Sequence, residues 1–295
     1  MKISVIIPVK NREHTIKETI ESILLSNYPN LEIIVVDNNS TDKTSEIVKK
    51  FQNVIYVKNE IDRERSYSRN LGIKISTGDF ITFIDSDDTF SKEIFDYFKK
   101  KQAKYFKDKF FFINYNFLEK NSIKHNQNSF KKKICTIKEL VNSNLISNIG
   151  IFVSKDLALD NFWDESKYII GTEDYDFVLR LMIKCNRAIL VNKKPLGYVR
   201  IHDGRSVYND KILKILKRFF FFKKKIYTDL IFKKLNTFNK KKIISTQALY
   251  ASLLLLNCGE RSKSGYFLLL AIRENKFCIF SKRFFYLIYK LVIRL

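Results

Sequence analysis

The sequence predicts an α/β domain built on a mostly parallel sheet with helices on both faces, followed by a helical, basic C-terminal region. Over the first hundred residues, short continuous apolar runs alternate with segments in which apolar residues recur at helical spacing. Strands that are apolar along their whole length are typical of a parallel sheet buried on both faces. From about residue 207, segments rich in basic and aromatic residues replace this alternation.

Each element follows from its own pattern. Apolar runs predict strands at residues 3–9, 31–37, 54–58 and 80–85. Amphipathic segments predict helices at residues 13–25, 42–51 and 66–76, the second of them capped by the Ser40-Thr41-Asp42 cluster. Farther along, the pattern predicts a strand at 110–117, an exposed loop at 119–133, a helix at 173–184 and a strand at 195–202. We expect one domain at 1–206 and a second region at 207–295.

Composition narrows the class of protein. The 295 residues are 45% hydrophobic and include only 8 Gly and 3 Pro, which excludes disordered and collagen-like chains. The net charge of +23 favours partners that carry phosphate or acidic lipid. Residues 207–295 hold 20 basic and 4 acidic side chains, a net charge of +16. Codon bias in an A+T-rich genome, which favours Lys, would explain the total charge. It explains less well why the basic residues are concentrated in residues 207–295.

Cysteine usage and apolar windows indicate the compartment. The four cysteines are far apart and form no C-x-x-C pair, so neither a zinc site nor a disulfide framework is expected. No window reaches the ~18 apolar residues of a membrane-spanning helix. The N-terminal apolar run is also too short for a signal peptide. We therefore expect a protein on the cytoplasmic side of the membrane.

The chain lacks both G-x-G-x-x-G and G-x-x-x-x-G-K-[ST], so a nucleotide site would have to hold phosphate by other means. Mg²⁺ or Mn²⁺ on carboxylates is the obvious substitute. Asp85, Asp87 and Asp88 follow the strand at 80–85 and supply such carboxylates. In the alternative interpretation, Asp87, Asp88 and Ser91 cap a helix that begins at Lys92.

Three further groups stand out, and each has a simple structural alternative. Asp37 ends the second strand, where ligands bind in parallel sheets, but it also suits a turn. Arg69 lies near the start of a predicted helix and suits an ordinary surface position as well. Glu173 and Asp174 form an acidic pair that is followed, after a gap, by His202, and a lone histidine is more often structural than a ligand.

The order and spacing of these segments resemble the family 2 glycosyltransferases, inverting enzymes of the GT-A fold. The matching segments are SVIIPVKN (4–11), IIVVDNNSTDKT (33–44), ERSYSRNLGI (64–73), TGDFITFIDSDD (77–88), GTEDYDFVLRL (171–181) and YVRIHDGRSV (198–207). They fall within the first two thirds of the chain, and the last ninety residues carry no such match. Two positions depart from the family pattern: Glu64 stands where Gly is frequent, and Asn38 where many members have a second Asp.

This resemblance implies a metal-dependent transfer of a sugar from a nucleoside-diphosphate sugar to a hydroxyl of a glycan or lipid-linked glycan. UDP is the common nucleotide, with GDP and dTDP as alternatives. The residues implied for nucleotide-sugar binding are Pro8, Val9, Asp37, Arg69, Asp85 and Ser86. Asp87 and His202 would hold Mn²⁺ or Mg²⁺, and Asp174 would be the catalytic base with Glu173 beside it.

The sequence leaves alternatives for the location of the basic region and for the function of the protein. Segments 211–227 and 281–295 either lie at an anionic membrane surface, on the cytoplasmic face of the inner membrane, or pack their apolar faces on the catalytic domain. The basic, aromatic composition also suits a nucleic-acid-binding protein. No nucleic acid is expected, however, because no such module is recognisable and the acidic cluster would repel phosphate. A catalytically inert family member in an assembly complex is disfavoured by the intact set Asp37, Asp85, Asp87, Asp174 and His202.

Overall fold

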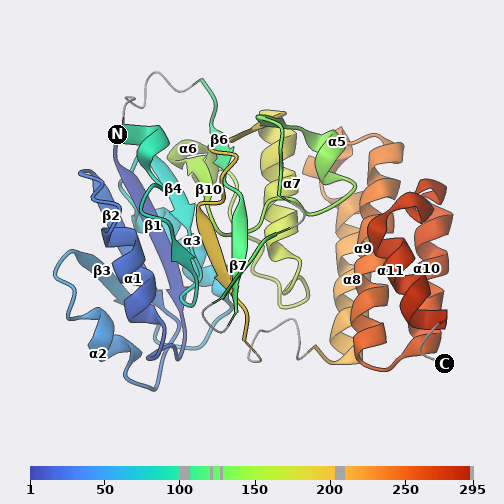
Figure 1. Ribbon diagram of the computed structural model, residues 1–295, viewed down its shortest axis with the longest axis horizontal. Coiled ribbons are helices and arrows are strands. Elements are labelled where there is room, and N and C mark those ends of the chain that lie inside the picture. The colour runs from blue at the N-terminus through green and yellow to red at the C-terminus, as the bar shows by residue number, and fades with distance from the viewer. Residues whose placement is uncertain (100–106, 120–121, 127–128, 203–209, 293–295) are drawn as a thin grey trace. The chain divides into compact units, whose positions relative to one another are not determined.

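The computed structural model describes residues 1–99, 107–119, 122–126, 129–202 and 210–292 (Figure 1). The chain divides into two compact units. The first comprises residues 1–136, 145–165 and 173–202, and the second comprises 137–144, 166–172 and the chain from 203 onward. The boundary predicted between residues 206 and 207 lies outside the described residues, so the division into domains 1–206 and 207–295 stays a prediction.

An eight-stranded mixed sheet forms the centre of the first unit (Figure 1). Neighbouring strands follow the order β3 (Val54–Lys58), β2 (Leu31–Asp37), β1 (Ile3–Val9), β4 (Phe80–Phe83), β10 (Ile151–Ser154), β6 (Phe110–Phe112), β11 (Ala188–Leu190), β9 (Ile134–Cys135). The first four strands are parallel, whereas β10 is antiparallel to both of its neighbours. The predicted α/β class is confirmed, and the first three strands have the predicted bounds.

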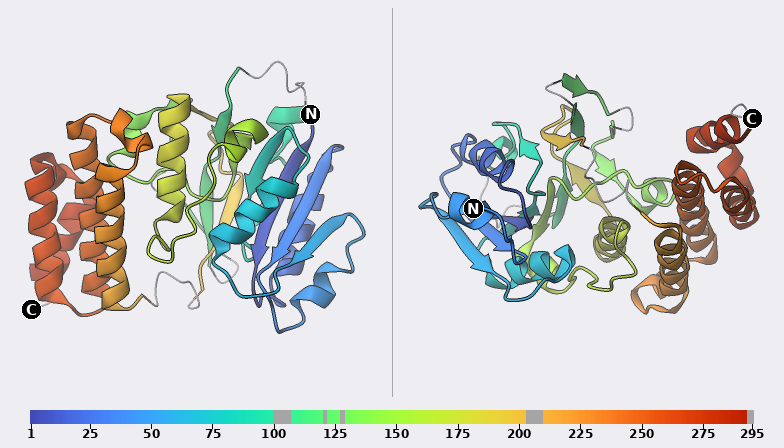
Figure 2. Two further views of the ribbon diagram at one scale, coloured as in Figure 1. Left: turned by 180° about the vertical axis from the view of Figure 1, so that it is seen from behind. Right: turned by 90° about the horizontal axis from the view of Figure 1, so that it is seen from below.

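Helices cover both faces of this sheet. Figure 1 shows α1 (Ile16–Leu24) in front of the strands, and the view from behind in Figure 2 shows α3 (Arg65–Ile75) on the opposite face. Helix α1 buries Ile16, Ile20 and Ile23, which share one face because they are four and three residues apart. Helix α2 is short, Thr44–Val48, where a helix at 42–51 was predicted.

A second, four-stranded sheet corrects one prediction. Its order is β5 (Thr89–Phe90), β12 (Gly197–Arg200), β7 (Tyr115–Glu119), β8 (Ser122–Lys124). The single strand predicted at 110–117 is wrong, because β6 joins the large sheet and β7 the small one. Between them, the buried Asn114 amide donates to the carbonyl oxygens of Phe130 and Lys193, and these long-range bonds fix the crossing from one sheet to the other.

The alternative that Asp87 and Asp88 cap a helix from Lys92 is also wrong. The chain after Asp88 forms strand β5, and the next helix, α4, is Asp96–Lys99. The loop predicted at 119–133 contains the hairpin strand β8. The first unit also contains α6 (Lys155–Leu159) and α7 (Glu173–Cys185), and α7 matches the predicted helix to within one residue.

The second unit is helical in its described part. It contains α5 (Ile137–Leu140), α8 (Ile212–Thr228), α9 (Thr237–Asn257), α10 (Arg261–Glu274), α11 (Lys282–Val292) and the 3₁₀ helices η2 (Ile231–Lys234) and η3 (Lys276–Phe280). Helix α9 packs against α8, α10 and α11. None of the helices within the described ranges is both long enough and apolar enough to cross a membrane.

Candidate active site

Strands β1, β2 and β4 end at the same edge of the large sheet because they are parallel, and the first polar residues of the site lie there. Asp37, at the end of β2, is fully buried. Its Oδ1 accepts from the Ser40 backbone N–H at 2.8 Å and its Oδ2 from the Tyr56 hydroxyl at 2.6 Å. Burial, together with this bond to Asp37, raises the pKa of Tyr56 to about 12. The orientation of the carboxylate is thereby fixed.

The end of β1 is hydrogen-bonded to the end of β2, next to Asp37. Val9 lies opposite Asp37 in the parallel register, and its carbonyl accepts from the Asn38 backbone N–H at 2.7 Å. Pro8 is buried one residue earlier, opposite Val36. The Asn38 side-chain oxygen in turn accepts from the Arg63 backbone N–H at 2.8 Å. The loop before α3 is therefore held beside Asp37.

The Asp85–Asp88 segment is a tight turn held by α1. The Asp88 backbone N–H donates to the Asp85 carbonyl at 3.0 Å. From α1 and its first turn, the hydroxyls of Thr15 and Thr19 donate to the carbonyls of Ser86 and Asp88, each at 2.8 Å. Ser86 is buried, and the hydrogen bond from Thr15 fixes its backbone between Asp85 and Asp87.

Asp87 and His202 lie side by side, although 115 residues separate them. The Nε2 of His202 is 3.0 Å from Oδ2 of Asp87, and the Arg12 Nε is 3.5 Å from the same oxygen. Arg200 fixes the turn from β12, donating through its backbone N–H to Asp88 Oδ1 and through its Nε to the Asp87 carbonyl.

The metal ligands that the resemblance implied can be tested on this geometry. Within the described ranges, no group of three or more His, Cys, Asp or Glu side chains is placed to hold a metal by itself. Asp87 and His202 do offer one carboxylate oxygen and one imidazole nitrogen that face each other. Mg²⁺ and similar ions are commonly held by one or two protein ligands, with substrate phosphates and water supplying the rest. The pair fits a metal that is bound together with a diphosphate.

Asp85 is paired with a buried cation. Its Oδ1 accepts from Arg69 Nη2 at 2.7 Å and from Asn148 Nδ2 at 2.9 Å. The Arg69 guanidinium lies 4.5 Å from the centre of the Trp163 ring, and Trp163 stacks on Phe177 of α7 at 4.1 Å. Arg69 Nε and Nη1 have no hydrogen-bond partner in the described part of the chain. The Arg69 guanidinium is therefore stabilised by its ion pair with Asp85 and by its contact with the face of the Trp163 ring.

Arg65 joins the turn to the acidic pair at the start of α7. It lies four residues before Arg69, on the same face of α3, and its Nη2 forms an ion pair with Oε1 of the buried Glu173. The negative charge of Glu173 above all, and also those of Asp85 and Asp174, raise the pKa of Arg65. These five residues therefore form one electrostatic cluster.

Asp174 is the member of this cluster with an altered protonation equilibrium. Burial is the main cause that raises the pKa of Asp174 to about 6, and the negative charge of Glu173 adds to it. Arg65 and Arg69 act in the opposite direction, as does the Tyr175 backbone N–H, which donates to Asp174 Oδ1 at 2.7 Å. A carboxylate with a pKa in this range can take up a proton near neutral pH.

The structure thus brings the residues selected from the sequence into three groups. Arg69, Asp85, Glu173 and Asp174 share the electrostatic cluster; Asp87 and His202 are adjacent; Pro8, Val9 and Asp37 lie at the ends of β1 and β2. Sequence reasoning missed Arg12, Arg65, Asn148 and Trp163. Only Arg65 left a signal, its helical spacing from Arg69, whereas Asn148 and Trp163 reach the site through contacts distant in sequence.

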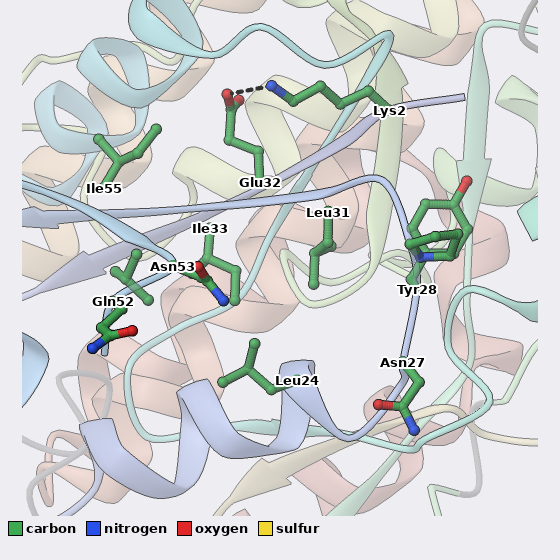
Figure 3. Close-up of a pocket in the computed structure, with 12 residues that line it drawn as sticks. Lys2, Leu24, Asn27, Tyr28, Leu31, Glu32, Ile33, Gln52, Asn53 and Ile55 are labelled. Atoms are coloured by element: carbon green, nitrogen blue, oxygen red, sulfur yellow. Dashed lines mark ion pairs between the residues drawn. The ribbon is translucent and has the colours of Figure 1, made fainter. Parts of the chain in front are cut away.

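A surface hollow lies elsewhere on the first unit (Figure 3). Its volume is about 630 Å³, and its lining includes Leu31 and Val54, at the starts of β2 and β3, and the Lys2–Glu32 ion pair. The carboxylates described above follow the opposite ends of the same sheet. A seven-residue strand separates its two ends by roughly 20 Å, so this hollow is distinct from the candidate active site.

Two comparisons identify the family. Residues 4–157 match the model of the family described as Glycosyl transferase family 2. Over 209 residues the chain is 31% identical to an uncharacterized glycosyltransferase of Haemophilus influenzae, an alignment that covers 68% of this chain and 79% of that protein. The chain belongs to glycosyl transferase family 2.

The first five curated relatives match over shorter segments. The Escherichia coli protein UDP-Glc:alpha-D-GlcNAc-diphosphoundecaprenol beta-1,3-glucosyltransferase WfaP is 41% identical over 88 residues, 29% of this chain and 35% of that protein. The alignments to the first five curated relatives span between 13% and 35% of the length of those proteins.

Solved structures confirm the GT-A fold. Staphylococcus aureus TarS in complex with UDP-GlcNAc has a TM-score of 0.60 at 19% identity, over 94% of this chain and 90% of that chain. TarS carries the name poly(ribitol-phosphate) beta-N-acetylglucosaminyltransferase. The mannosyltransferase PcManGT from Pyrobaculum calidifontis, in complex with GDP-Man and Mn²⁺, has a TM-score of 0.60 at 13% identity, over 99% of this chain and 86% of that chain.

Proposed function

We propose that this chain is a metal-dependent inverting glycosyltransferase that moves a sugar from a nucleoside-diphosphate sugar to a hydroxyl of a glycan or lipid-linked glycan. The observation that carries the proposal is the electrostatic link, through Arg65 and Arg69, between Asp174 and the Asp85 turn. An inverting transfer needs a proton acceptor at the attacking hydroxyl and positive charge at the leaving diphosphate. Family membership and the GT-A fold support this reaction class.

The nucleotide-sugar site consists of the ends of β1 and β2 and the Asp85 turn. Pro8, Val9 and Asp37 take the nucleobase, and Arg69, Asp85 and Ser86 take the ribose and diphosphate. Asp37 would accept a hydrogen bond from a base N–H only if the buried end of β2 opened toward the nucleotide, because both of its oxygens already accept hydrogen bonds from Ser40 and Tyr56. UDP is the proposed nucleotide, because TarS was solved with UDP-GlcNAc and the name of WfaP specifies UDP-Glc. GDP, bound by PcManGT, and dTDP are the alternatives.

Asp87 and His202 hold Mn²⁺ or Mg²⁺ in this proposal. The metal, when bound with the sugar donor, offsets the negative charge that develops on the leaving diphosphate. Arg12, at 3.5 Å from the Asp87 carboxylate, adds positive charge at the same place. The Mn²⁺ bound with GDP-Man in PcManGT supports a metal in this fold.

Asp174 acts as the base in a single displacement. It takes the proton of the acceptor hydroxyl while the hydroxyl oxygen forms a bond to the anomeric carbon. The bond from that carbon to the diphosphate oxygen breaks on the opposite face, and the nucleotide leaves with the electron pair. Glu173 keeps its ion pair with Arg65 and thereby holds both charges beside Asp174.

The acceptor is a glycan or a lipid-linked glycan. The name of WfaP specifies a sugar on diphosphoundecaprenol, and that of TarS specifies poly(ribitol-phosphate). These names support a hydroxyl on a glycan, polymer or lipid-linked saccharide as the attacking group.

Replacing Asp174 by Asn tests the assignment of the base. Asp174→Asn should lower kcat by about 10²–10⁴-fold and leave the affinity for the sugar donor unchanged, because a general base acts only in the transition state. Steady-state kinetics together with calorimetric titration of the sugar donor measure the two quantities separately. Near-normal turnover by Asp174→Asn would show that another group takes the proton.

Calorimetric titration of the wild-type chain with UDP-, GDP- and dTDP-sugars, with and without Mn²⁺, tests the proposed function itself. We expect one nucleotide to bind, and only in the presence of the metal. No binding of any nucleotide sugar would contradict the proposal and favour a catalytically inert family member.

A further inference from the structure

The end of the second unit carries an apolar surface that no described part of the chain covers. In 3₁₀ helix η3 and helix α11, seven large side chains are exposed: Phe277, Ile279, Phe280, Phe285, Tyr286, Ile288 and Tyr289. The exposed fractions of Phe280 and Phe285 are 73% and 61%. Isolated exposed apolar residues are normal in proteins, whereas seven within thirteen positions make a patch that indicates an interaction site.

The arrangement along α11 shows that this exposure is a face of the helix. Phe285, Ile288 and Tyr289 are three and four residues apart, which places them on one side, and all three are exposed. Leu287 points the opposite way and is completely buried where α11 packs on α9. Helix α11 therefore uses one apolar face within the second unit and presents another outward.

The segment that carries the patch has positive side chains and no negative ones. Residues 275–295 contain no Asp or Glu, while Lys276, Lys282, Arg283 and Lys290 lie within η3 and α11 or next to them. The Lys276 ammonium lies 5.5 Å from the centre of the Phe277 ring, and that of Lys290 lies 5.7 Å from the centre of the Tyr286 ring. The cations and the exposed rings thus share one surface.

We propose that residues 276–290 form a surface that binds anionic lipid bilayers. The outward side chains of α11 and η3 enter the boundary between headgroups and acyl chains, and the lysines contact the anionic headgroups. This inference goes beyond the proposed function, because it concerns where the chain resides and needs no nucleotide sugar.

The chemistry of the patch favours a bilayer over other partners. A second copy of the chain would bring its own cations against these, and like charges across an interface oppose association. Single-stranded nucleic acid binds through rings that stack on bases, and the exposed aliphatic side chain of Ile288 has no role in such stacking. A lipid surface takes up aromatic, aliphatic and cationic side chains together.

Sedimentation of the full-length protein with vesicles tests the proposal. Vesicles of phosphatidylcholine alone are compared with vesicles containing about one third phosphatidylglycerol, at about 0.05 and 0.3 M NaCl. We expect binding to the anionic vesicles only, weakened by salt. Lys276→Gln with Lys282→Gln should weaken binding by about 25-fold, at about fivefold per charge. Phe285→Ser with Ile288→Ser should weaken it by at least about tenfold.

Matched controls come from the first unit. Lys17→Gln with Lys50→Gln removes two exposed lysines, and Leu25→Ser with Ile61→Ser removes two side chains that are 68% and 57% exposed. These variants should bind vesicles as the wild type does. Equal losses in control and test variants would overturn the proposal, as would equal binding to both kinds of vesicle.

A fluorescence measurement keeps the test decisive if a serine variant fails to fold. Tyr289→Trp should shift its emission to the blue on anionic vesicles, whereas Leu25→Trp should not; the native Trp163 is buried and gives a constant background. An unshifted Tyr289→Trp spectrum contradicts the proposal. Two other results would also contradict it: a dimer in light scattering that Phe285→Ser with Ile288→Ser abolishes, and binding of RNA but not of vesicles that Lys276→Gln with Lys282→Gln abolishes.

Discussion

At the scale of single residues, the protonation of Asp174 depends on the charges around it. Glu173 raises the pKa of Asp174, and Arg65 and Arg69 lower it. In the proposed reaction Asp174 must be ionised, so kcat/KM should rise with pH through the pKa of about 6 and level off above it. The acidic limb of the pH profile therefore reports the balance of these charges.

Glu173→Gln should move that limb to lower pH by about one unit, because it removes a negative neighbour and frees Arg65 to act on Asp174. The measurement is kcat/KM for sugar transfer across the acidic range. Arg65→Gln introduced into the Glu173→Gln background is the matched comparison, and it should move the limb back to higher pH. An acidic limb that stays in place in both variants would show that these neighbours do not control the base.

Some residues of the site could be predicted from the sequence and others could not, depending on whether their partners are near in the sequence. Asp37, Asp85 and Asp87 were selected because they end or follow strands whose pattern is local, and the role of Asp174 came from its match to a family segment. The pairing of Arg65 with Glu173 could not be predicted, because these residues are 108 positions apart and an ion pair leaves no local trace in the sequence. The residue roles themselves stay predictions until the variants are measured.

At the scale of elements, helix α3 connects the fold to the site. It carries Arg65 and Arg69 toward the carboxylates, and its Gly72 lies against Ile6 of β1. A Cβ at position 72 would stand 2.5 Å from Ile6 Cγ2, so the helix approaches the strand more closely than any side chain allows. Both arginines depend on this close approach, because they lie on the same helix.

Gly72→Ala should therefore destabilise the protein by about 1–3 kcal/mol, the usual cost of overpacking a core, and lower the transfer rate. The free energy of unfolding, measured by urea denaturation, checks this value. Gly265→Ala is the matched control, since Gly265 lies within α10 and an added Cβ there meets no atom within 4 Å. That substitution should stabilise the helix by up to about 1 kcal/mol. Equal effects of the two substitutions would contradict the role given to Gly72.

Three strands with a local pattern were predicted with their bounds. Strands β1, β2 and β3 follow from continuous apolar runs that end at polar residues. The run 110–117 looks like one strand for the same reason, yet it divides between two sheets at Ile113 and Asn114. The partners of the Asn114 amide, Phe130 and Lys193, lie 16 and 79 residues away, so local periodicity carries no sign of the division.

At the scale of the whole molecule, the net charge of +23 attracts any diphosphate. A general attraction of this kind weakens with salt, since the screening length falls from about 10 Å at 0.1 M ionic strength to shorter values above it. Binding through Asp87 and His202 would instead require a divalent metal and tolerate salt better, because both groups are partly buried at a fixed separation of 3.0 Å. The two kinds of binding can therefore be separated in one experiment.

Thermal unfolding of the whole chain with UDP, at about 0.3 M NaCl, provides that separation. A ligand at about 100 times its Kd adds about 2.7 kcal/mol to the free energy of unfolding, so UDP with Mn²⁺ should raise Tm by several degrees. Chelation by EDTA should abolish the rise, and renewed Mn²⁺ should restore it. Asp87→Asn and His202→Ala should lose the metal-dependent part of the rise, while their Tm without ligand stays near that of the wild type. A rise that survives EDTA, and that is present at about 0.05 M NaCl but absent at about 0.3 M, would mean that UDP is held by the net positive charge and that Asp87 and His202 are not metal ligands.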